Sequence, residues 1–242
     1  LSLHDASDLT LYARTSYSRV VIANSHSNIV EIMKNGEAIL KRPIVMQSED
    51  DQTDRSCLNL HDIIAYADTV DLADVRDLLD LQIRNNMSIC EEGLVHDYGI
   101  NIGKILSEQA SDGKASACAY TAAGIDAHMG GCELPVAVLC ASGSIGIAAT
   151  VPIVCYAKQQ GIGEDRMYRA LLVSDLLTVH QKANGRRAHF CSVGYAGCAV
   201  GAAIAYLLGG EEDNVAKTLA NCQRVMLDAV CDGANPSCAA KV

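Results

Sequence analysis

The sequence has few aromatic, proline and basic residues. It contains no Trp, one Phe and 4 Pro among 242 residues, and aromatic residues make up 4%. A core without large rings is filled by aliphatic and small side chains, which suits close-packed helices rich in Ala and Gly. The 19 Lys and Arg residues stand against 29 Asp and Glu, for a net charge of −10. Such a charge repels phosphate backbones and anionic lipid, so we expect neither nucleic acid nor a membrane surface as partner.

Two stretches without charge, residues 134–157 and 190–210, are long enough to cross a bilayer. The first contains Pro135, Pro152 and a Ser-Gly segment, and the second is mostly Ala, Gly, Ser and Cys. Neither has aromatic anchors or an asymmetry of flanking basic residues. We therefore predict that both are buried helices of a protein outside the membrane.

Cysteine is unusually frequent, with 11 residues. An odd number in a chain of this length does not favour a disulfide scaffold. Several, such as Cys140, Cys155 and Cys198, lie in apolar runs, where a free thiol behaves as a small hydrophobic group. This usage is typical of a reducing compartment, so we expect a cytoplasmic protein.

The hydrophobic pattern changes along the chain. Residues 11–46 contain short β-branched runs, with Asn35-Gly36 as a hairpin turn, and a polar linker follows. From Leu60 the period is helical, with Asn59 and Asp71 as predicted N-caps. Further helices are predicted over 99–110, 114–127, 146–160, 164–183, 188–208 and 212–230. We predict an α+β fold: a β-rich portion with a hairpin over 1–56, then a predominantly helical domain over 57–242.

Three cysteines form the first candidate site. Cys231 and Cys238 flank a segment in which Asp-Gly and Asn-Pro dipeptides disfavour helix, so both thiols can turn toward one point. Cys191 begins a predicted helix of small residues, and a helix N-terminus favours the thiolate that binds metal. The residues alone leave two interpretations open: a metal site, or three cysteines of the core.

A second candidate site is the segment Ser142-Gly-Ser-Ile-Gly146, which precedes a helix predicted to begin near Ile147. Unhindered backbone N–H groups at a helix start bind anions such as a carboxylate. A glycine-rich turn between two helices explains the same pattern without any function.

These motifs together resemble a known family. The runs DAHMGG at 126–131, SGSIGIAATVP at 142–152, GR at 185–186 and CDGANPSC at 231–238 resemble the iron–sulfur L-serine dehydratase α-chain family. The likeness is strongest to its L-cysteine desulfidases and the related uncharacterised proteins. It implies a [4Fe–4S] cluster held by Cys191, Cys231 and Cys238, with one iron open to a leaving group.

The implied reaction is β-elimination from a small L-amino acid, giving pyruvate and ammonia with sulfide from cysteine or water from serine. The likeness places the substrate carboxylate at Ser142, Gly143, Ser144 and Gly146. Relatives carry SGSGNQG here, whereas this chain has Ile145 and lacks both amides. The alternative is therefore a descendant of the same fold that binds a cluster or ligand without catalysis.

Other polar residues match the family singly, and each also has a structural explanation. His26 and Asn28 match an H-x-N segment of the family, which implies that they line the pocket, with Asn28 binding substrate; a lone loop histidine is also often structural. Arg186 could pair with a carboxylate or cap a helix, and Lys182 could line a pocket or face solvent. The base is not identified; His26, His128 and Lys182 are the candidates.

The family's GCTEP segment, which carries the proposed catalytic cysteine of the desulfidases, does not occur in this chain, which begins at Leu1. We therefore expect the N-terminal part to be missing or to lie on a second chain. We also expect the apolar face that it would cover to be buried by another copy of this chain, in a homo-oligomer, or by another chain.

Overall fold

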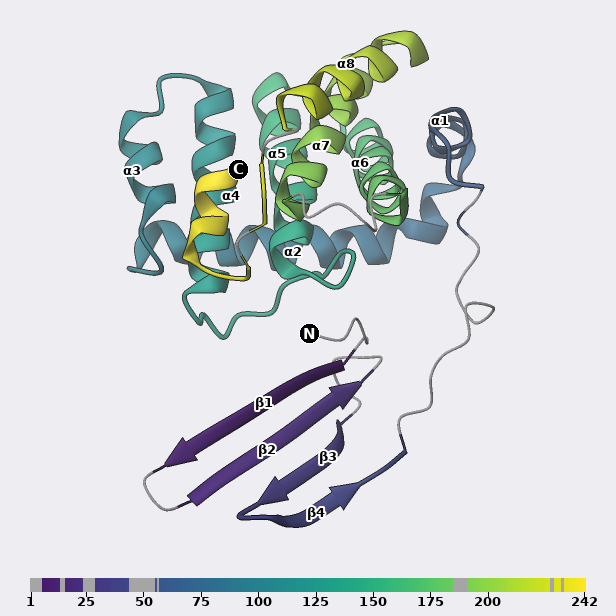
Figure 1. The fold of residues 1–242 in the computed structure, drawn as a ribbon. Coiled ribbons are helices and arrows are strands. Elements are labelled where there is room, and N and C mark those ends of the chain that lie inside the picture. Colours follow the sequence, from purple (N-terminus) through teal and green to yellow (C-terminus); the bar gives the residue numbers. More distant parts are fainter. Residues whose placement is uncertain are drawn as a thin grey trace. The chain divides into compact units, whose positions relative to one another are not determined.

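The structure is a computed structural model that describes residues 6–13, 16–23, 29–43, 55, 57–184, 191–226, 229–231 and 233–242. Contacts divide the chain into two units, Leu1–Asp54 and Arg55–Val242. Figure 1 shows the strands of the first unit and the helices of the second. The α+β prediction is confirmed.

The N-terminal unit contains a four-stranded antiparallel sheet in sequential order. Its strands are β1 (Ala6–Ala13), β2 (Ser16–Ala23), β3 (Ile29–Lys34) and β4 (Glu37–Lys41). The predicted hairpin turn joins β3 to β4, with φ of 51° at Asn35 and 91° at Gly36. Asn and Gly tolerate this left-handed conformation better than other residues, which explains their place in the turn.

The second unit is helical. Its elements are α1 (Leu60–Thr69), α2 (Leu72–Val95), α3 (Ile102–Gln109), α4 (Gly113–Met129), α5 (Gly143–Gln160), α6 (Glu164–Asn184), α7 (Ser192–Leu207), α8 (Glu212–Val225) and the 3₁₀ helix η2 (Pro236–Lys241). The predicted caps are confirmed: the Asn59 side chain accepts from Asp62 N, and the Asp71 side chain accepts from Ala73 N.

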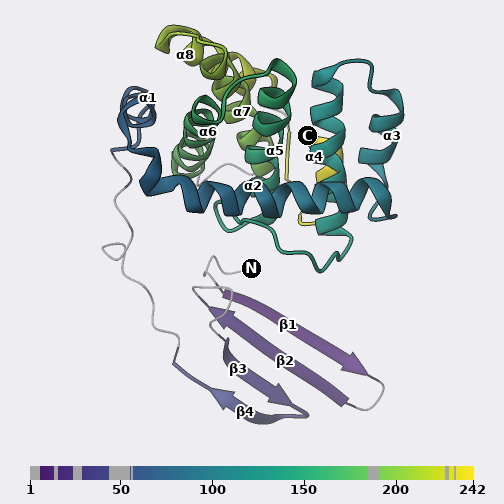
Figure 2. The ribbon, with the colours of Figure 1, turned by 180° about the vertical axis from the view of Figure 1, so that it is seen from behind.

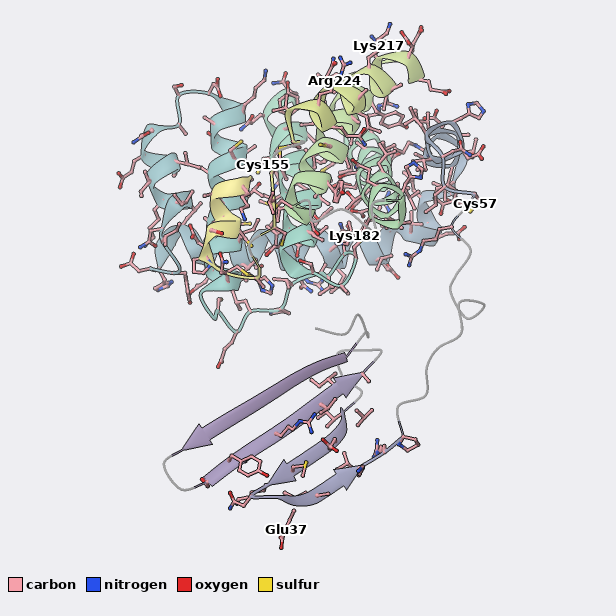
Figure 3. The ribbon with its side chains drawn as sticks, viewed as in Figure 1. Glu37, Cys57, Cys155, Lys182, Lys217 and Arg224 are labelled. Atoms are coloured by element: carbon pink, nitrogen blue, oxygen red, sulfur yellow. The ribbon has the colours of Figure 1, made fainter. Side chains whose placement is uncertain are left out.

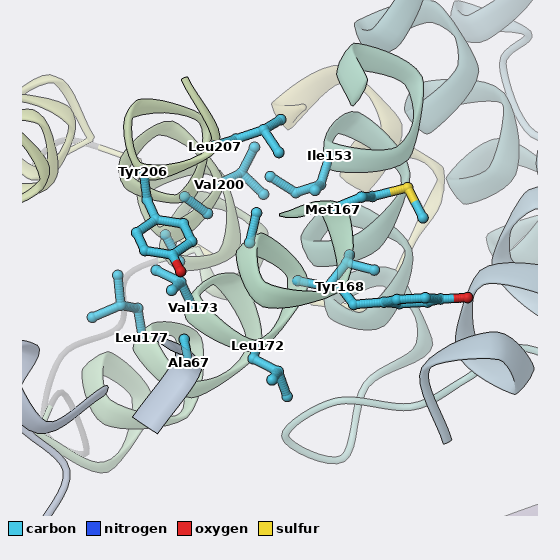
Figure 4. Packing of buried hydrophobic residues seen from close by; sticks show 14 of the residues in the cluster. Ala67, Ile153, Met167, Tyr168, Leu172, Val173, Leu177, Val200, Tyr206 and Leu207 are labelled. Atoms are coloured by element: carbon cyan, nitrogen blue, oxygen red, sulfur yellow. The ribbon is translucent and has the colours of Figure 1, made fainter. Parts of the chain in front are cut away.

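Helix α2 runs beneath the other helices of this unit and contacts α4, α5 and α6 (Figure 2). Above it, aliphatic side chains from α5, α6 and α7 interdigitate, among them Ile153, Val173 and Val200 (Figure 4). Many of the remaining buried positions are alanines. The helices therefore pack closely, as the scarcity of aromatic residues predicts.

The start of α5 corrects one prediction. The sequence predicts a loop over Ser142–Gly146 and a helix near Ile147, whereas the helix begins at Gly143. The Ser142 hydroxyl caps this earlier start by accepting from Ile145 N at 3.4 Å. Gly146 permits it, because a Cβ there would overlap the carbonyl oxygen of Ala137.

Within the described ranges, no helix is long and apolar enough to span a bilayer. The two uncharged stretches instead contribute the buried helices α5 and α7.

Candidate functional site

The start of α5 is held by a tight turn. Leu139 N donates to Ser142 O at 3.2 Å, and Ser142 N donates to Leu139 O at 3.0 Å. The central residues Cys140 and Ala141 have φ of 50° and 62°. Residues other than Gly rarely adopt this left-handed conformation, and such strain is concentrated at functional sites.

Ser144 is the unusual residue of this helix start. Its side chain is 3% exposed, and its Oγ has no hydrogen-bond partner among the described residues. A buried hydroxyl without a partner costs about 1–3 kcal/mol, so its retention calls for an explanation. It lies in the first turn of α5, where the helix dipole and backbone N–H groups favour an anion. A bound carboxylate would accept a hydrogen bond from this hydroxyl.

His128 lies at the same place. A Cβ added to Gly143 would overlap the His128 ring at Nε2, so imidazole and helix start are in direct contact. Burial lowers the pKa of His128, which keeps the ring neutral at pH 7. The structure thus brings His128 of the DAHMGG run together with the Ser142–Gly146 segment.

A buried polar network extends from this helix start. Thr150 donates from Oγ1 to Gly146 O at 2.7 Å. The same Oγ1 accepts from Gln82 Nε2 at 2.8 Å and from Asn86 Nδ2 at 3.0 Å. Asn86 Oδ1 in turn accepts from Ala137 N at 2.9 Å. Helix α2 thereby fixes both the first turn of α5 and the segment that packs against it.

The network ends at Asp175 of α6, whose Oδ1 accepts from Gln82 Nε2 at 3.1 Å. Burial raises the pKa of this carboxyl to about 7, and the bond from Gln82 opposes the rise. The charges of Lys182, Arg55 and Asp175 all act on the Cys140 thiol. Each of these three groups therefore lies near Cys140, in the strained turn.

Lys182 (Figure 3) is exposed, and its Nζ donates to Ser192 Oγ at 2.7 Å. Ser192 is the first residue of α7 and follows Cys191, the N-cap of that helix. Lys182 and Asp175 are seven positions apart in α6 and so lie on one face. One end of this face, at Asp175, contacts the polar network, and the other end, at Lys182, contacts the residue that follows Cys191.

The three predicted cluster cysteines differ in environment. Cys191 and Cys238 are buried and belong to the same apolar cluster, whereas Cys231 is exposed. Cys191 N donates to Ala229 O at 2.8 Å, which fixes the start of α7 beside the chain that leads to Cys231. The Cys238 thiol donates to Gly233 O at 3.6 Å and thus faces the segment between Cys231 and itself.

Across the described ranges, no group of three His, Cys, Asp or Glu side chains is arranged as a metal site. The donor set nevertheless fits a cluster in its chemistry, since all three thiols are free and two of them, Cys191 and Cys238, belong to the same buried cluster. Ligation by Cys191, Cys231 and Cys238 stays a prediction.

Asp126 of the DAHMGG run has a structural role. Its carboxylate accepts from Ile100 N at 3.3 Å and from Gly103 N at 3.0 Å. It thereby caps α3, whose own N-cap Asn101 makes no capping bond with its side chain.

An apolar cavity of about 560 Å³ lies between α4, α5, α7 and α8, and none of the predicted site residues line it. His26, Asn28 and Arg186 fall outside the described residues. The predictions for these three stay untested.

Sequence reasoning missed Asp175, Gln82, Asn86 and Thr150. A signal for two of them exists, because Gln82 and Asn86 fall at helical spacing between the buried Leu79 and Ile89. Asp175 is the one charged residue in the run Ala170–Val179. Polar residues at core positions are the pattern that could have identified this network.

The chain is an α+β protein with a candidate small-molecule site at a helix start. It belongs to the serine dehydratase alpha chain family, which matches residues 18–242. This membership confirms the resemblance seen in the motifs.

The curated relatives are UPF0597 proteins. One from Desulfitobacterium hafniense is 44% identical over 97% of this chain and 55% of its own length. Others from Treponema denticola and Finegoldia magna are each 40% identical, over 91% and 92% of this chain and 53% and 54% of their own lengths. The chain thus spans about half the length of these relatives. No solved structure matches it.

Proposed function

We propose that the protein is an iron–sulfur lyase that eliminates the β-substituent of L-cysteine or L-serine in the cytoplasm. The Cα–H and Cβ–S or Cβ–O bonds break, and a Cα=Cβ bond forms. The leaving group departs with its electron pair, and water then converts the aminoacrylate product to pyruvate and ammonia. Family membership supports this reaction class.

The observation that carries the proposal is the buried Ser144 hydroxyl without a partner in the described chain, at the start of an 18-residue helix. We assign the substrate carboxylate to this hydroxyl and the neighbouring N–H groups, with neutral His128 at the edge of the site. When bound to Cys191, Cys231 and Cys238, a [4Fe–4S] cluster supplies an open iron as Lewis acid for the leaving group.

The test is the formation of pyruvate by anaerobically purified, iron-loaded protein given L-cysteine or L-serine. Sulfide release distinguishes the two substrates. Ser144→Ala should raise KM about tenfold, the effect of losing a hydrogen bond to a charged group. Ser174→Ala is the matched control, because the Ser174 hydroxyl already donates to Ala149 O at 2.8 Å. An unchanged KM in Ser144→Ala would place the carboxylate elsewhere.

A second candidate function is ligand binding without catalysis. It is favoured by Ile145, which stands where the motif of the resembled family has an amide and is 2% exposed in an apolar cluster. A protein of this kind would bind the amino acid in calorimetry yet form no pyruvate, whether or not iron is loaded.

We further propose that the whole protein needs a part that this chain does not span, either on a second chain or on a second copy. Adding the unspanned part of a relative in trans should then raise pyruvate formation. A full rate from the 242-residue chain alone would contradict this.

A further inference from the structure

We infer that Asp175 is the base that accepts the α-proton of the substrate in the proposed elimination. The inference rests on the proposed function, and sequence reasoning had left the base among His26, His128 and Lys182.

Among the described residues, the hydrogen bonding of Asp175 leaves one carboxylate oxygen for a substrate. Gln82 binds Oδ1 at 3.1 Å, and Gln82 is itself fixed by Thr150 at 2.8 Å. Among the described residues no cation forms an ion pair with Asp175. A carboxylate that is held at one oxygen and is not neutralised by a salt bridge is prepared to take a proton at the other, Oδ2.

The surroundings favour proton transfer near neutral pH. Burial raises the pKa of Asp175 to about 7. A general base with a pKa near the working pH is largely deprotonated and still has a strong tendency to take a proton. Among the groups near it, burial raises the pKa of the Cys140 thiol, so that group is protonated at pH 7. Lys182 is bound to Ser192, and Arg55 supplies only a positive charge.

The position of Asp175 also fits. The chain of bonds from Asp175 through Gln82 and Thr150 ends at Gly146 O, in the helix start assigned to the carboxylate. Toward the C-terminus of α6, the same face carries Lys182, which is bonded to the residue after Cys191. Hydrogen bonds thus connect Asp175 to the proposed carboxylate site, and the helix face that carries Asp175 also carries Lys182, next to the proposed leaving-group site.

In the proposed step the Asp175 carboxylate takes the α-proton at Oδ2, and the electron pair of the Cα–H bond becomes the second bond between Cα and Cβ. The leaving group departs from Cβ with the pair of its own bond. No oxidant or reductant is needed. The proton then returns to solvent or to the leaving group.

Asp175→Asn tests the assignment in the full, iron-loaded protein. We expect kcat to fall at least about 100-fold with little change in KM, the usual contribution of a general base. In the wild type, log kcat should rise with pH and level off near pH 7. This rise, the acidic limb of the profile, should be absent from the pH profile of any activity that the variant retains. Asp165→Asn on the exposed face of α6 is the matched control and should keep the wild-type profile.

His128→Gln is the rival variant, because its imidazole is the other described group near the helix start that can accept a proton. Loss of the acidic limb in His128→Gln would overturn the assignment of Asp175 as the base, and so would a rate within threefold of wild type in Asp175→Asn. Either result would leave the proposed function standing. A wild type that forms no pyruvate from either amino acid would overturn the proposed function, and this inference with it.

A readout independent of turnover follows the Asp175 carboxyl carbon by NMR in the protein without substrate. Its chemical shift should titrate with a midpoint near pH 7. Gln82→Met removes the amide that stabilises the charged form, so the midpoint should move to higher pH. A midpoint below pH 5 would contradict the assignment, whatever the activity.

Discussion

At the scale of single residues, replacing Ser144 should raise the stability of the protein while weakening its binding of substrate. Its buried hydroxyl lacks a partner in the described structure, so Ser144→Ala should stabilise the protein without substrate by about 1 kcal/mol. Ser174→Ala should destabilise it by a similar amount, because it removes a buried bond to Ala149 O. Urea unfolding of both variants measures the difference. Destabilisation by Ser144→Ala would mean that the hydroxyl has a structural partner.

Asp175 predicts how stability depends on pH. Its pKa is raised from 3.8 to about 7 in the folded protein. Between these values the folded state holds a proton that the unfolded chain has released, so the stability contributed by this group falls as pH rises. Asp175→Asn removes the effect, and its stability relative to wild type should grow from pH 4 to about pH 7 and then level off.

At about 1.4 kcal/mol per pKa unit, the shift of Asp175 corresponds to at most about 4 kcal/mol. Asp175 is only half-buried, so solvent screening should reduce the observed gain to about 2 kcal/mol. Urea unfolding at several pH values checks it, with Asp165→Asn as the control that should show no such trend. A constant difference between Asp175→Asn and wild type would contradict the raised pKa.

At the scale of elements, the start of α5 depends on a glycine. A Cβ at Gly146 would overlap Ala137 O, and neither backbone segment can yield as a flexible side chain would. Gly146→Ala should therefore destabilise the protein by more than about 2 kcal/mol and separate the Ala137 segment from the helix. Gly197→Ala in α7 is the control: its Cβ meets nothing within 4 Å. There the helix should gain up to about 1 kcal/mol. Equal thermal shifts for the two variants would contradict the close approach.

The same element shows what sequence predicts well. Helical periodicity and caps such as Asn59 depend on residues close in sequence, so the helices could be predicted. The early start of α5 depends on Gly146 meeting Ala137, a contact that periodicity does not encode. The network from Asp175 to Gly146 joins three helices and likewise required the structure. The contact of His128 with Gly143 also required the structure. The motifs identify both residues as candidates but do not predict that they touch.

At the scale of the whole molecule, the proposed cluster would join distant parts of the chain. Cys191 caps α7, whereas Cys231 and Cys238 lie in the C-terminal segment. Replacing any of the three by Ser should abolish bound iron, because each thiolate is a required ligand. Cys155→Ser, which changes a thiol of α5, should leave the iron content unchanged. Iron retained in all three variants would place the cluster elsewhere.

Alkylation provides a readout of the same site that does not depend on activity. Cys231 is exposed in this structure, as are Cys57 and Cys118. Ligation to iron converts a thiol into a bound thiolate that no longer reacts, so iron loading should protect Cys231 from iodoacetamide. Cys57 and Cys118 should react equally with and without iron, which controls for any general loss of exposure. Cys231 must then turn from solvent toward the buried Cys191 and Cys238, so its protection would report ligation directly. Unchanged reactivity of Cys231 in iron-loaded protein would exclude it as a ligand.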